Sequence, residues 1–294
     1  MKPSYAIIGC GRVGSALARH LSAAGYQPAA FSSRTWDSAL QTAKAAGGEV
    51  LVYESPWEAS ARAAVVFITT PDHSIAPVCQ TIADNKGFQE KAVVLHCSGA
   101  LSSDMLSAAK RCGAVIGSMH PLQSFAAMTE ANPFAGIKIA IEGDTAAVER
   151  ASGMAADLGA DPLSIRTEGK TLYHAAAVVA SNYLVTLMRL SFQLLQASGV
   201  PQSEAYGVLK PLISGTLSNI EGVGIPDALT GPIARGDVDT VSEHLSAIRR
   251  LSETAADLYI RLGQATIEIG TAKGSLSKDA ADRLNRLFNP SSAD

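Results

Sequence analysis

The sequence predicts an α/β domain with a doubly wound, mostly parallel sheet, followed by an all-helical domain. Short apolar or β-branched runs alternate with Ala-rich helical stretches up to about residue 165, a pattern typical of βαβ units. Beyond that point the sequence shows long helical periods and no convincing strand. We therefore expect one domain over residues 1–165 and a second, helical domain over residues 166–294.

Seven strands are expected in the first domain. Their sequences, in chain order, are YAIIG, PAAFSS, EVLVY, AVVFIT, AVVLHC, AVIGSM and IKIAIEG. Most of these runs are apolar throughout, as in a sheet that helices cover on both faces. Helices between the strands are expected at residues 12–24, 37–46 and 102–111. In the second domain they are expected at residues 168–198, 203–221, 238–250, 252–272 and 277–288, separated by Gly- and Pro-containing breaks.

Composition excludes several classes of protein. The formal net charge of −3, without a long run of one sign, argues against a nucleic-acid or anionic-membrane partner. The apolar run around 172–188 contains His174 and Asn182 and is followed directly by Arg189, so we interpret it as a buried helix and not as a membrane span. The four cysteines form no CxxC motif, and a strand begins too early for a signal peptide. We therefore expect a cytoplasmic protein.

A glycine-rich loop follows the first strand. Gly9, Gly11 and Gly14 form a GxGxxG pattern between that strand and the next helix, a context typical of dinucleotide binding. Gly9 permits the tight turn, Gly11 lets the backbone approach a pyrophosphate, and Gly14 lets the helix pack on the strand. The helix N-terminus at Arg12 and Val13 supplies N–H groups for the phosphates. The alternative is a glycine-rich turn without a ligand.

The end of the second strand should distinguish NAD from NADP. An acidic residue at this position would bind the ribose hydroxyls of NAD. The sequence instead has Ser33, Arg34 and Thr35, and the first acidic residue is Asp37. An arginine with neighbouring hydroxyls suits a 2′-phosphate, which predicts NADP(H). The alternative is a solvent-exposed arginine without a ligand.

Polar residues gather where the fourth, fifth and sixth strands end. They are Thr70, Pro71, His73, His96, Ser98, His120 and Gln123. Ligands of open α/β sheets bind beyond the carboxyl ends of the strands. We therefore expect Thr70, Pro71 and Ser98 beside the cofactor, His120 among the catalytic groups and Gln123 beside the substrate.

The three histidines of this rim could suggest a metal site. Each follows a different strand, no HxH or HxxxH spacing occurs, and no carboxylate cluster joins them, unlike an ordinary zinc site. We therefore expect no metal. For each histidine the alternative to a functional role is a hydrogen bond that anchors a loop.

Four segments carry a resemblance to a known family. They are LHCSGAL (95–101), HPLQSF (120–125), YHAAAVVASNY (173–183) and LTGPIARGD (229–237). With the glycine loop, they resemble Rossmann-like proteins that carry the C-terminal domain of unknown function 2520. More distantly, the chain is similar to β-hydroxyacid dehydrogenases, ketopantoate reductases and 6-phosphogluconate dehydrogenase-like helical domains. The resemblance implies an NADP oxidoreductase, with an alternative form of ketopantoate reductase as one activity.

The resemblance also implies a proton donor on the first helix of the second domain. Ketopantoate reductases have a Lys-xxx-Asn-xxx-Asn motif there, with the lysine as donor. This chain has His174, Val178 and Asn182 at the same spacing. His174 would therefore take the role of the acid and Asn182 that of the second asparagine, while Lys170, one turn earlier, is the rival donor.

Helix geometry places Ser181 about 20° from His174 around the axis and Asn182 about 80° away. An imidazole near its ordinary pKa suits protonation of a forming alkoxide; the alternative is a structural histidine bonded to a backbone carbonyl. We expect Ser181, Thr230 and Arg235 to bind the substrate, since the Arg fork suits a carboxylate. An interhelical turn is the alternative role for the segment around Arg235.

Three hypotheses about function remain. The first is an NADP-dependent reductase of a small oxo acid, for which 2-dehydropantoate is one candidate, acting at an interdomain cleft. The second is an imine reductase of the pyrroline-carboxylate type. The third is a protein that binds NADP(H) as a sensor or scaffold without turnover. The long Ala-rich helices further suggest a homodimer through the helical domain.

Overall fold

The computed structural model describes residues 2–125 and 131–289. The chain divides into two compact units, Met1–Tyr183 and Leu184–Asp294. The sequence analysis placed the boundary at residue 165, whereas the division by contacts falls at residue 183. The segment between these positions belongs to the first unit because its first residues are held by the sheet, with Lys170 almost completely buried there.

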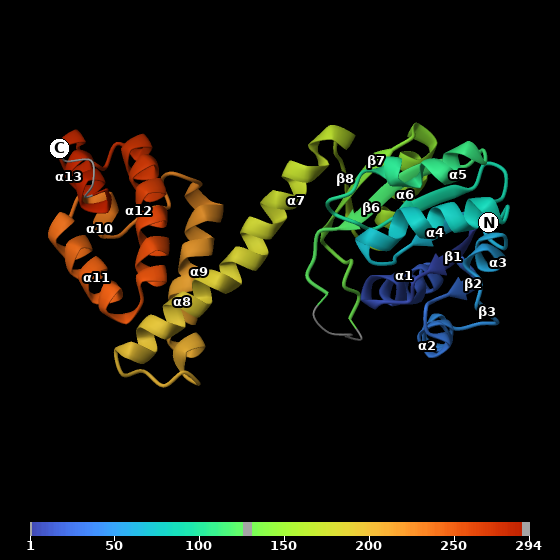
Figure 1. Cartoon of the computed structure of the whole chain (residues 1–294), viewed down its shortest axis with the longest axis horizontal. Coiled ribbons are helices and arrows are strands. Elements are labelled where there is room, and N and C mark those ends of the chain that lie inside the picture. The colour runs from blue at the N-terminus through green and yellow to red at the C-terminus, as the bar shows by residue number, and fades with distance from the viewer. Residues whose placement is uncertain (1, 126–130, 290–294) are drawn as a thin grey trace. The chain divides into compact units, whose positions relative to one another are not determined.

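The first unit is built on an eight-stranded sheet in the order β3-β2-β1-β4-β5-β6-β7-β8 (Figure 1). The strands are β1 Ser4–Ile8, β2 Gln27–Ser32, β3 Leu51–Tyr53, β4 Val65–Ile68, β5 Val93–His96, β6 Val115–Pro121, β7 Lys138–Gly143 and β8 Asp161–Ser164. Adjacent strands pair in parallel except β6 and β7, which are antiparallel. All seven predicted strands are present. The sequence analysis missed β8, an exposed edge strand of sequence DPLS whose proline is tolerated only at a sheet edge.

Helices cover both faces of this sheet, which confirms the doubly wound α/β fold. They are α1 Arg12–Ala23, α2 Trp36–Ala46, α3 Pro56–Ser60, α4 Asp72–Asp84, η1 Ser103–Leu106, α5 Ser107–Arg111 and α6 Thr145–Asp157. One apolar core joins Leu17 of α1 and Ala147 of α6 to Phe67. The other joins Ile75 of α4 and Ala108 of α5 on the opposite face. The strand ends therefore lie between two packed layers, and the loops that follow them form a common rim.

A long helical segment follows the sheet. It consists of η2 Thr167–Gly169, α7 Lys170–Val178, a π-helical turn Val179–Tyr183 (η3) and α8 Leu184–Ala197. The prediction that this segment is buried is wrong for the chain on its own, because Leu172 and Val185 are 78% and 70% exposed. By length and composition Thr167–Ala197 could cross a membrane, and 0% of its most apolar window is buried. A periodic apolar pattern shows that one face of a helix is apolar. It does not show whether that face is covered by the same chain or by another molecule in an assembly.

The second unit is helical, as predicted. After α8 it contains α9 Ala205–Val223, α10 Pro232–Arg235, α11 Val238–Leu251, α12 Glu253–Lys273 and α13 Lys278–Phe288. Its core includes Val241, Leu245 and Phe288. The side chains of Asp237, Ser252 and Ser277 cap α11, α12 and α13, which fixes where these helices begin. The short α10 lies between two positive-φ glycines, in a segment predicted as a break.

Candidate functional site

The glycine loop has the geometry that a dinucleotide site requires. Gly9 has a φ of +105°, and a Cβ there would lie 2.8 Å from the Thr70 backbone nitrogen. A Cβ on Gly14 would lie 2.3 Å from the Gly9 carbonyl oxygen, so α1 packs directly on the loop. A Cβ on Gly11, in contrast, would meet no atom within 4 Å. No side chain caps α1 at Gly11, so the helix N-terminus offers backbone N–H groups to an anion.

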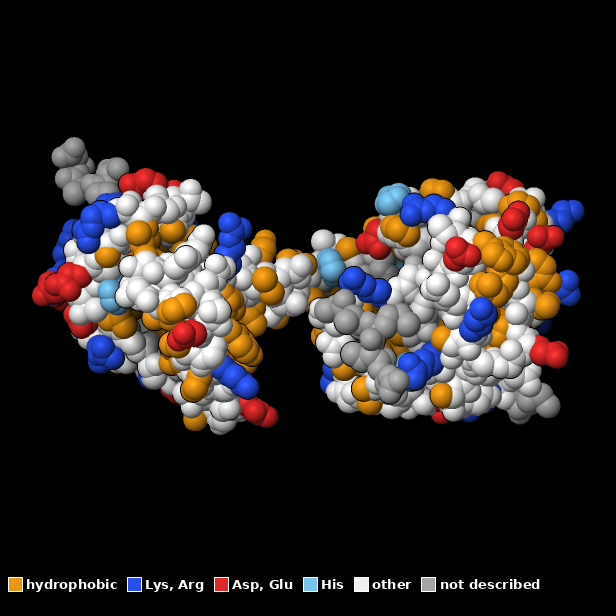
Figure 2. All heavy atoms as spheres, turned by 90° about the horizontal axis from the view of Figure 1, so that it is seen from below, with side chains coloured by type: hydrophobic (Ala, Val, Ile, Leu, Met, Phe, Trp, Pro, Cys, Tyr) orange, Lys and Arg blue, Asp and Glu red, His pale blue; other side chains and the backbone are white. Residues whose placement is uncertain are grey.

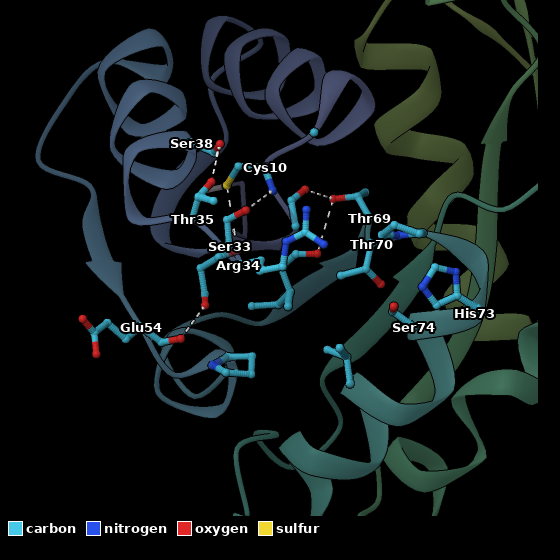
Figure 3. Close-up of a pocket in the computed structure, with 17 residues that line it drawn as sticks. Cys10, Ser33, Arg34, Thr35, Ser38, Glu54, Thr69, Thr70, His73 and Ser74 are labelled. Carbon is cyan, nitrogen blue, oxygen red and sulfur yellow. Dashed lines mark hydrogen bonds between the residues drawn. The ribbon is translucent and has the colours of Figure 1, made fainter.

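A cleft of about 550 Å³ opens beside this loop (Figure 3). It joins the segments that follow β1, β2, β3 and β4. Its lining includes Gly9, Gly11, Ser33, Arg34, Thr35, Ser38, Glu54, Thr70, Pro71, His73 and Ser74. The Ser33 hydroxyl accepts a hydrogen bond from the Cys10 backbone at 3.3 Å, and Thr69 donates to the Gly9 carbonyl at 2.6 Å. The loops around the cleft are thereby tied to each other.

Six of the ten predicted cofactor residues line this cleft, but Arg12, Val13, Gly14 and Ser98 do not. Arg12 is exposed and donates from Nη1 to the Phe125 carbonyl at 3.1 Å. Val13 packs against the apolar core. Ser98 follows β5 and is not among the lining residues. Glu54, which the sequence analysis missed, does line the cleft, and its place directly after the third predicted strand was the signal that could have found it.

Ser98 serves to tie the ends of two strands together. Its hydroxyl donates to Asp72 Oδ2 at 2.8 Å and accepts from the backbone nitrogens of Ala100 and Leu101. His96, two residues before Ser98, is fully buried. Its Nδ1 accepts a hydrogen bond from the Ser98 backbone, and its Nε2 is bonded to the Ser102 carbonyl. The loop-anchoring alternative therefore describes His96 well.

Two of the three predicted catalytic residues lie together. The rings of His120, on β6, and His174, on α7, are 6.0 Å apart between centroids and nearly perpendicular. His120 Nδ1 forms a 3.0 Å hydrogen bond with the Tyr173 hydroxyl. Both rings pack on Gly99, where a Cβ would lie 2.4 Å from His174 Nδ1 and 2.8 Å from His120 Nε2. The glycine of the CSGAL segment thus makes room for the imidazole pair.

The protonation of His120 is set by its surroundings. Burial, the positive charge of Lys170 and the neighbouring His174 lower the pKa of His120 to about 4, while Asp72 opposes them. His120 is therefore neutral near pH 7. A neutral imidazole has one donor and one acceptor nitrogen. The His120 ring can therefore accept a proton at one nitrogen while it donates a proton from the other, without carrying a net charge.

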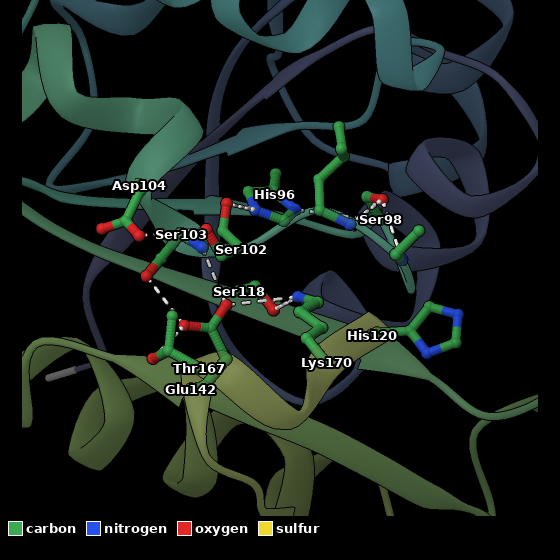
Figure 4. A network of polar contacts seen from close by, with 12 residues as sticks. His96, Ser98, Ser102, Ser103, Asp104, Ser118, His120, Glu142, Thr167 and Lys170 are labelled. Carbon is green, nitrogen blue, oxygen red and sulfur yellow. Dashed lines mark hydrogen bonds and ion pairs between the residues drawn. The ribbon is translucent and has the colours of Figure 1, made fainter. Parts of the chain in front are cut away.

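Lys170, the rival donor, is held in the protein interior (Figure 4). Its Nζ donates to the Ser118 hydroxyl and forms a 3.2 Å ion pair with Glu142 of β7. Glu142 in turn accepts from the Ser103 backbone and hydroxyl and from Thr167. Lys170 is only 1% exposed, so it cannot reach a substrate at the rim. The network instead fixes the first turn of α7, and with it the position of His174 one turn later.

The pKa of Glu142 gives this network a pH dependence. Burial raises the pKa of Glu142, but the hydrogen bond from Ser103 and the charge of Lys170 outweigh burial and hold the pKa below its usual value. A depressed carboxyl pKa stabilises the fold above the unfolded value of about 4.3, and this contribution is lost as the pH falls further. We expect Glu142→Gln to lower the unfolding free energy at pH 7 and the deficit to shrink below pH ~4.

Urea unfolding of the wild type and Glu142→Gln, at pH 7 and below pH ~4, measures this effect. Glu149→Gln, on the exposed side of α6, is the matched control and should be neutral at both. A deficit of the same size at both pH values would show that the negative charge of Glu142 is not what stabilises the network.

The remaining predicted site residues are not brought to this cluster by the described structure of either unit. Asn182 and Ser181 lie in the π-helical turn and are exposed. Gln123 is exposed, and its side-chain oxygen accepts from the Ser124 backbone. Thr230 and Arg235 belong to the second unit, beside and within α10. Their roles stay predictions.

No group of three or more metal-ligating side chains occurs among residues 2–125 and 131–289. The side chains gathered at the rim are two imidazoles, a phenol and a carboxylate.

Comparison with known proteins shows two family matches in tandem. The profile of a Rossmann-like domain matches residues 2–121, and that of a domain of unknown function, DUF2520, matches residues 137–266. No curated protein matches the sequence. The second match begins at β7, so it includes the Glu142 side of the buried network as well as α7.

Solved structures share the fold over nearly the whole chain. A Bacteroides fragilis protein provisionally described as an NADP oxidoreductase is 24% identical, with a TM-score of 0.74 over 91% of this chain and 98% of its own. A Thermotoga maritima protein is 26% identical, with a TM-score of 0.71 over 92% and 99%. A pyrroline-5-carboxylate reductase from Coxiella burnetii is 17% identical, with a TM-score of 0.58 over 98% and 99%.

Proposed function

We propose that this protein, a Rossmann-like protein with a DUF2520 domain, is an NADP-dependent oxidoreductase that reduces the carbonyl group of a small oxo acid. The observation that carries the proposal is the imidazole pair of His120 and His174, which lies on the same strand-end rim as the glycine-loop cleft. 2-Dehydropantoate is one candidate substrate. The likeness to a pyrroline-5-carboxylate reductase supports a second candidate, a cyclic imine.

The cleft fits NADP(H) by its shape and by its donors. The open space at Gly11 and the uncapped N-terminus of α1 suit a pyrophosphate. Ser33, Arg34 and Thr35 supply hydroxyls and a guanidinium at the end of β2, which suit a 2′-phosphate. When bound, NADPH supplies the hydride.

The chain itself must supply the proton. His174 is half-buried on α7 and its Nδ1 is buried, so we assign the contact with the substrate to the other ring nitrogen, Nε2. A proton given from Nε2 to the forming alkoxide neutralises the charge that hydride transfer creates. Lys170 holds α7 in place for this step through Ser118 and Glu142.

The test is NADPH oxidation followed at 340 nm, with 2-dehydropantoate beside a panel of 2-oxo acids and cyclic imines. Turnover of an oxo acid supports the proposal. Turnover restricted to imines supports the second candidate. Tight NADPH binding without turnover of any panel member would favour the sensor or scaffold hypothesis instead.

Arg34 should set the preference for NADPH over NADH. A charge-assisted hydrogen bond contributes about 1.5–3 kcal/mol, so we expect Arg34→Ala to weaken NADPH binding about 10- to 100-fold and to leave NADH binding nearly unchanged. Titration of both cofactors, followed by fluorescence, measures this. Arg150→Ala, on the exposed side of α6, is the control. An equal loss for both cofactors would mean that Arg34 does not contact the 2′-phosphate.

We expect a second copy of the chain to cover the exposed apolar face of α9. Apolar side chains lie at the surface of the helical unit (Figure 2); on α9 they include Tyr206, Val208, Leu212, Leu217, Ile220 and Val223. The helix carries only Lys210 and Glu221 as charged residues. A monomeric soluble protein rarely exposes such a face, and a self-complementary helix face suits a twofold dimer.

Light scattering after size exclusion should therefore show a dimer for the wild type and a monomer for Val208→Glu/Leu212→Glu. Leu251→Glu, at an exposed apolar position of α11, is the control and should remain dimeric. A monomeric wild type, or one recovered with lipid vesicles, would contradict the dimer.

A further inference from the structure

Three side chains form a row that ends at His174. The Tyr173 hydroxyl lies 3.0 Å from His120 Nδ1. The two nearly perpendicular imidazole rings both lie against Gly99, with His174 Nδ1 and His120 Nε2 as the atoms nearest to the position a Cβ would take. The row therefore runs from a phenol through both nitrogens of one imidazole to the inner nitrogen of the other.

The inner nitrogen of His174 is an anomaly. His174 Nδ1 is buried and has no hydrogen-bond partner within the part of the chain that the structure describes. A buried polar atom without a partner costs about 1–3 kcal/mol, so its persistence calls for a reason. His120 Nε2 is the other nitrogen that lies close to the same position at Gly99.

The protonation states suit proton transfer along this row. His120 has a pKa of about 4, set by burial, Lys170 and His174 and opposed by Asp72. Burial raises the pKa of Tyr173. Both groups are therefore neutral near pH 7. With the Tyr173 hydroxyl donating to Nδ1, the single proton of neutral His120 must sit on Nε2, on the side of His174.

We propose that Tyr173 and His120 form a proton relay that resupplies His174. This role rests on the proposed function. His174 gives its Nε2 proton to the substrate oxygen and receives a proton at Nδ1 from His120 Nε2. His120 takes the Tyr173 hydroxyl proton at Nδ1, and solvent restores the phenol. One solvent proton is consumed per hydride transferred, no group of the row keeps a charge, and a tautomer exchange of both imidazoles resets it.

The first test needs no substrate. Long-range ¹H–¹⁵N NMR of the histidine rings should show His120 as the Nε2–H tautomer, neutral down to pH ~5. Tyr173→Phe should shift the His120 Nδ1 resonance. The chain offers a matched control, since His244 and Tyr259 of the second unit form a similar 3.1 Å pair, and Tyr259→Phe should leave the His120 signals unchanged. A proton on His120 Nδ1, or titration near pH 6.5, would overturn the relay.

The second test uses the substrate that the NADPH oxidation panel identifies. We expect Tyr173→Phe to lower kcat about tenfold and His120→Ala about 100-fold, with the KM for NADPH unchanged. The solvent isotope effect should rise in both variants, and added imidazole should restore part of the kcat of His120→Ala. If the role of His120 were only structural, its replacement would leave the solvent isotope effect unchanged, and added imidazole would not restore kcat.

The two proposals fail in different ways. If the wild type turns over no substrate, the proposed function fails. The NMR experiment still decides whether His120 carries its proton on Nε2, as the relay requires, or on Nδ1. Turnover with an unchanged solvent isotope effect in both variants overturns the relay and leaves the proposed function standing.

Discussion

Replacing Lys170 by methionine should lower the free energy of unfolding by about 3–5 kcal/mol. The change leaves Glu142, which is 2% exposed, with a buried charge and without its ion-pair partner. It also removes the donor to Ser118. Breaking one side of a buried pair costs more than the pair contributes, because the remaining charge must be kept out of water unpaired. Urea unfolding, followed by circular dichroism, measures the loss.

A double-mutant cycle separates the pair from its packing. Lys170→Met/Glu142→Gln should recover part of the loss, because no unpaired charge remains and the Gln oxygen still accepts from Ser103. Lys138→Met is the control, since Lys138 pairs with Asp161 on the exposed edge of the sheet, where an ion pair contributes about 0–1 kcal/mol. Equal losses of unfolding free energy for Lys170→Met and Lys138→Met would show that burial does not make the inner ion pair more important for stability than the exposed one.

This buried pair shows where sequence reasoning stops. Lys170 and Glu142 are 28 residues apart, and neither stands in a local pattern that assigns a partner. The pair forms because β7 returns antiparallel to β6 and α7 begins beside it. That antiparallel step has no marker in a run as short as IKIAIEG, so the sequence offered Lys170 only as a rival proton donor.

Other parts of the site could be predicted because their signals are local. The glycine loop needs only a strand, three glycines at fixed spacing and a helix. The strand-end rule predicted His120 on the rim of the sheet. The polarity of His174 within an apolar helix marked it as a candidate. Its place beside His120 and Gly99 could not be predicted, because it depends on where α7 lies relative to the rim. The exposed face of the same helix was misread as buried for a related reason: periodicity shows an apolar face but not what covers it.

The largest effect on activity is expected from His174→Ala. Loss of a general acid costs about 10²–10⁴ in turnover, because hydride transfer would then leave an unprotonated alkoxide. NADPH binding should be unchanged, since His174 does not line the glycine-loop cleft. Single-turnover NADPH oxidation beside a binding titration separates these two effects. His244→Ala, which removes an exposed imidazole from α11, is the control and should retain full activity.

The alternatives to His174 as the acid make different predictions for the same experiment. Were His120 the acid, His174→Ala would lose little and His120→Ala would lose the larger part of the turnover. Were Lys170 the acid, the ion pair with Glu142 would have to open in each cycle, and Lys170→Met would remove turnover beyond its cost in stability. The structure disfavours Lys170, because its buried ammonium is already satisfied by Ser118 and Glu142. Turnover of His174→Ala equal to that of the wild type would make His174 a packing residue that occupies the space left by Gly99.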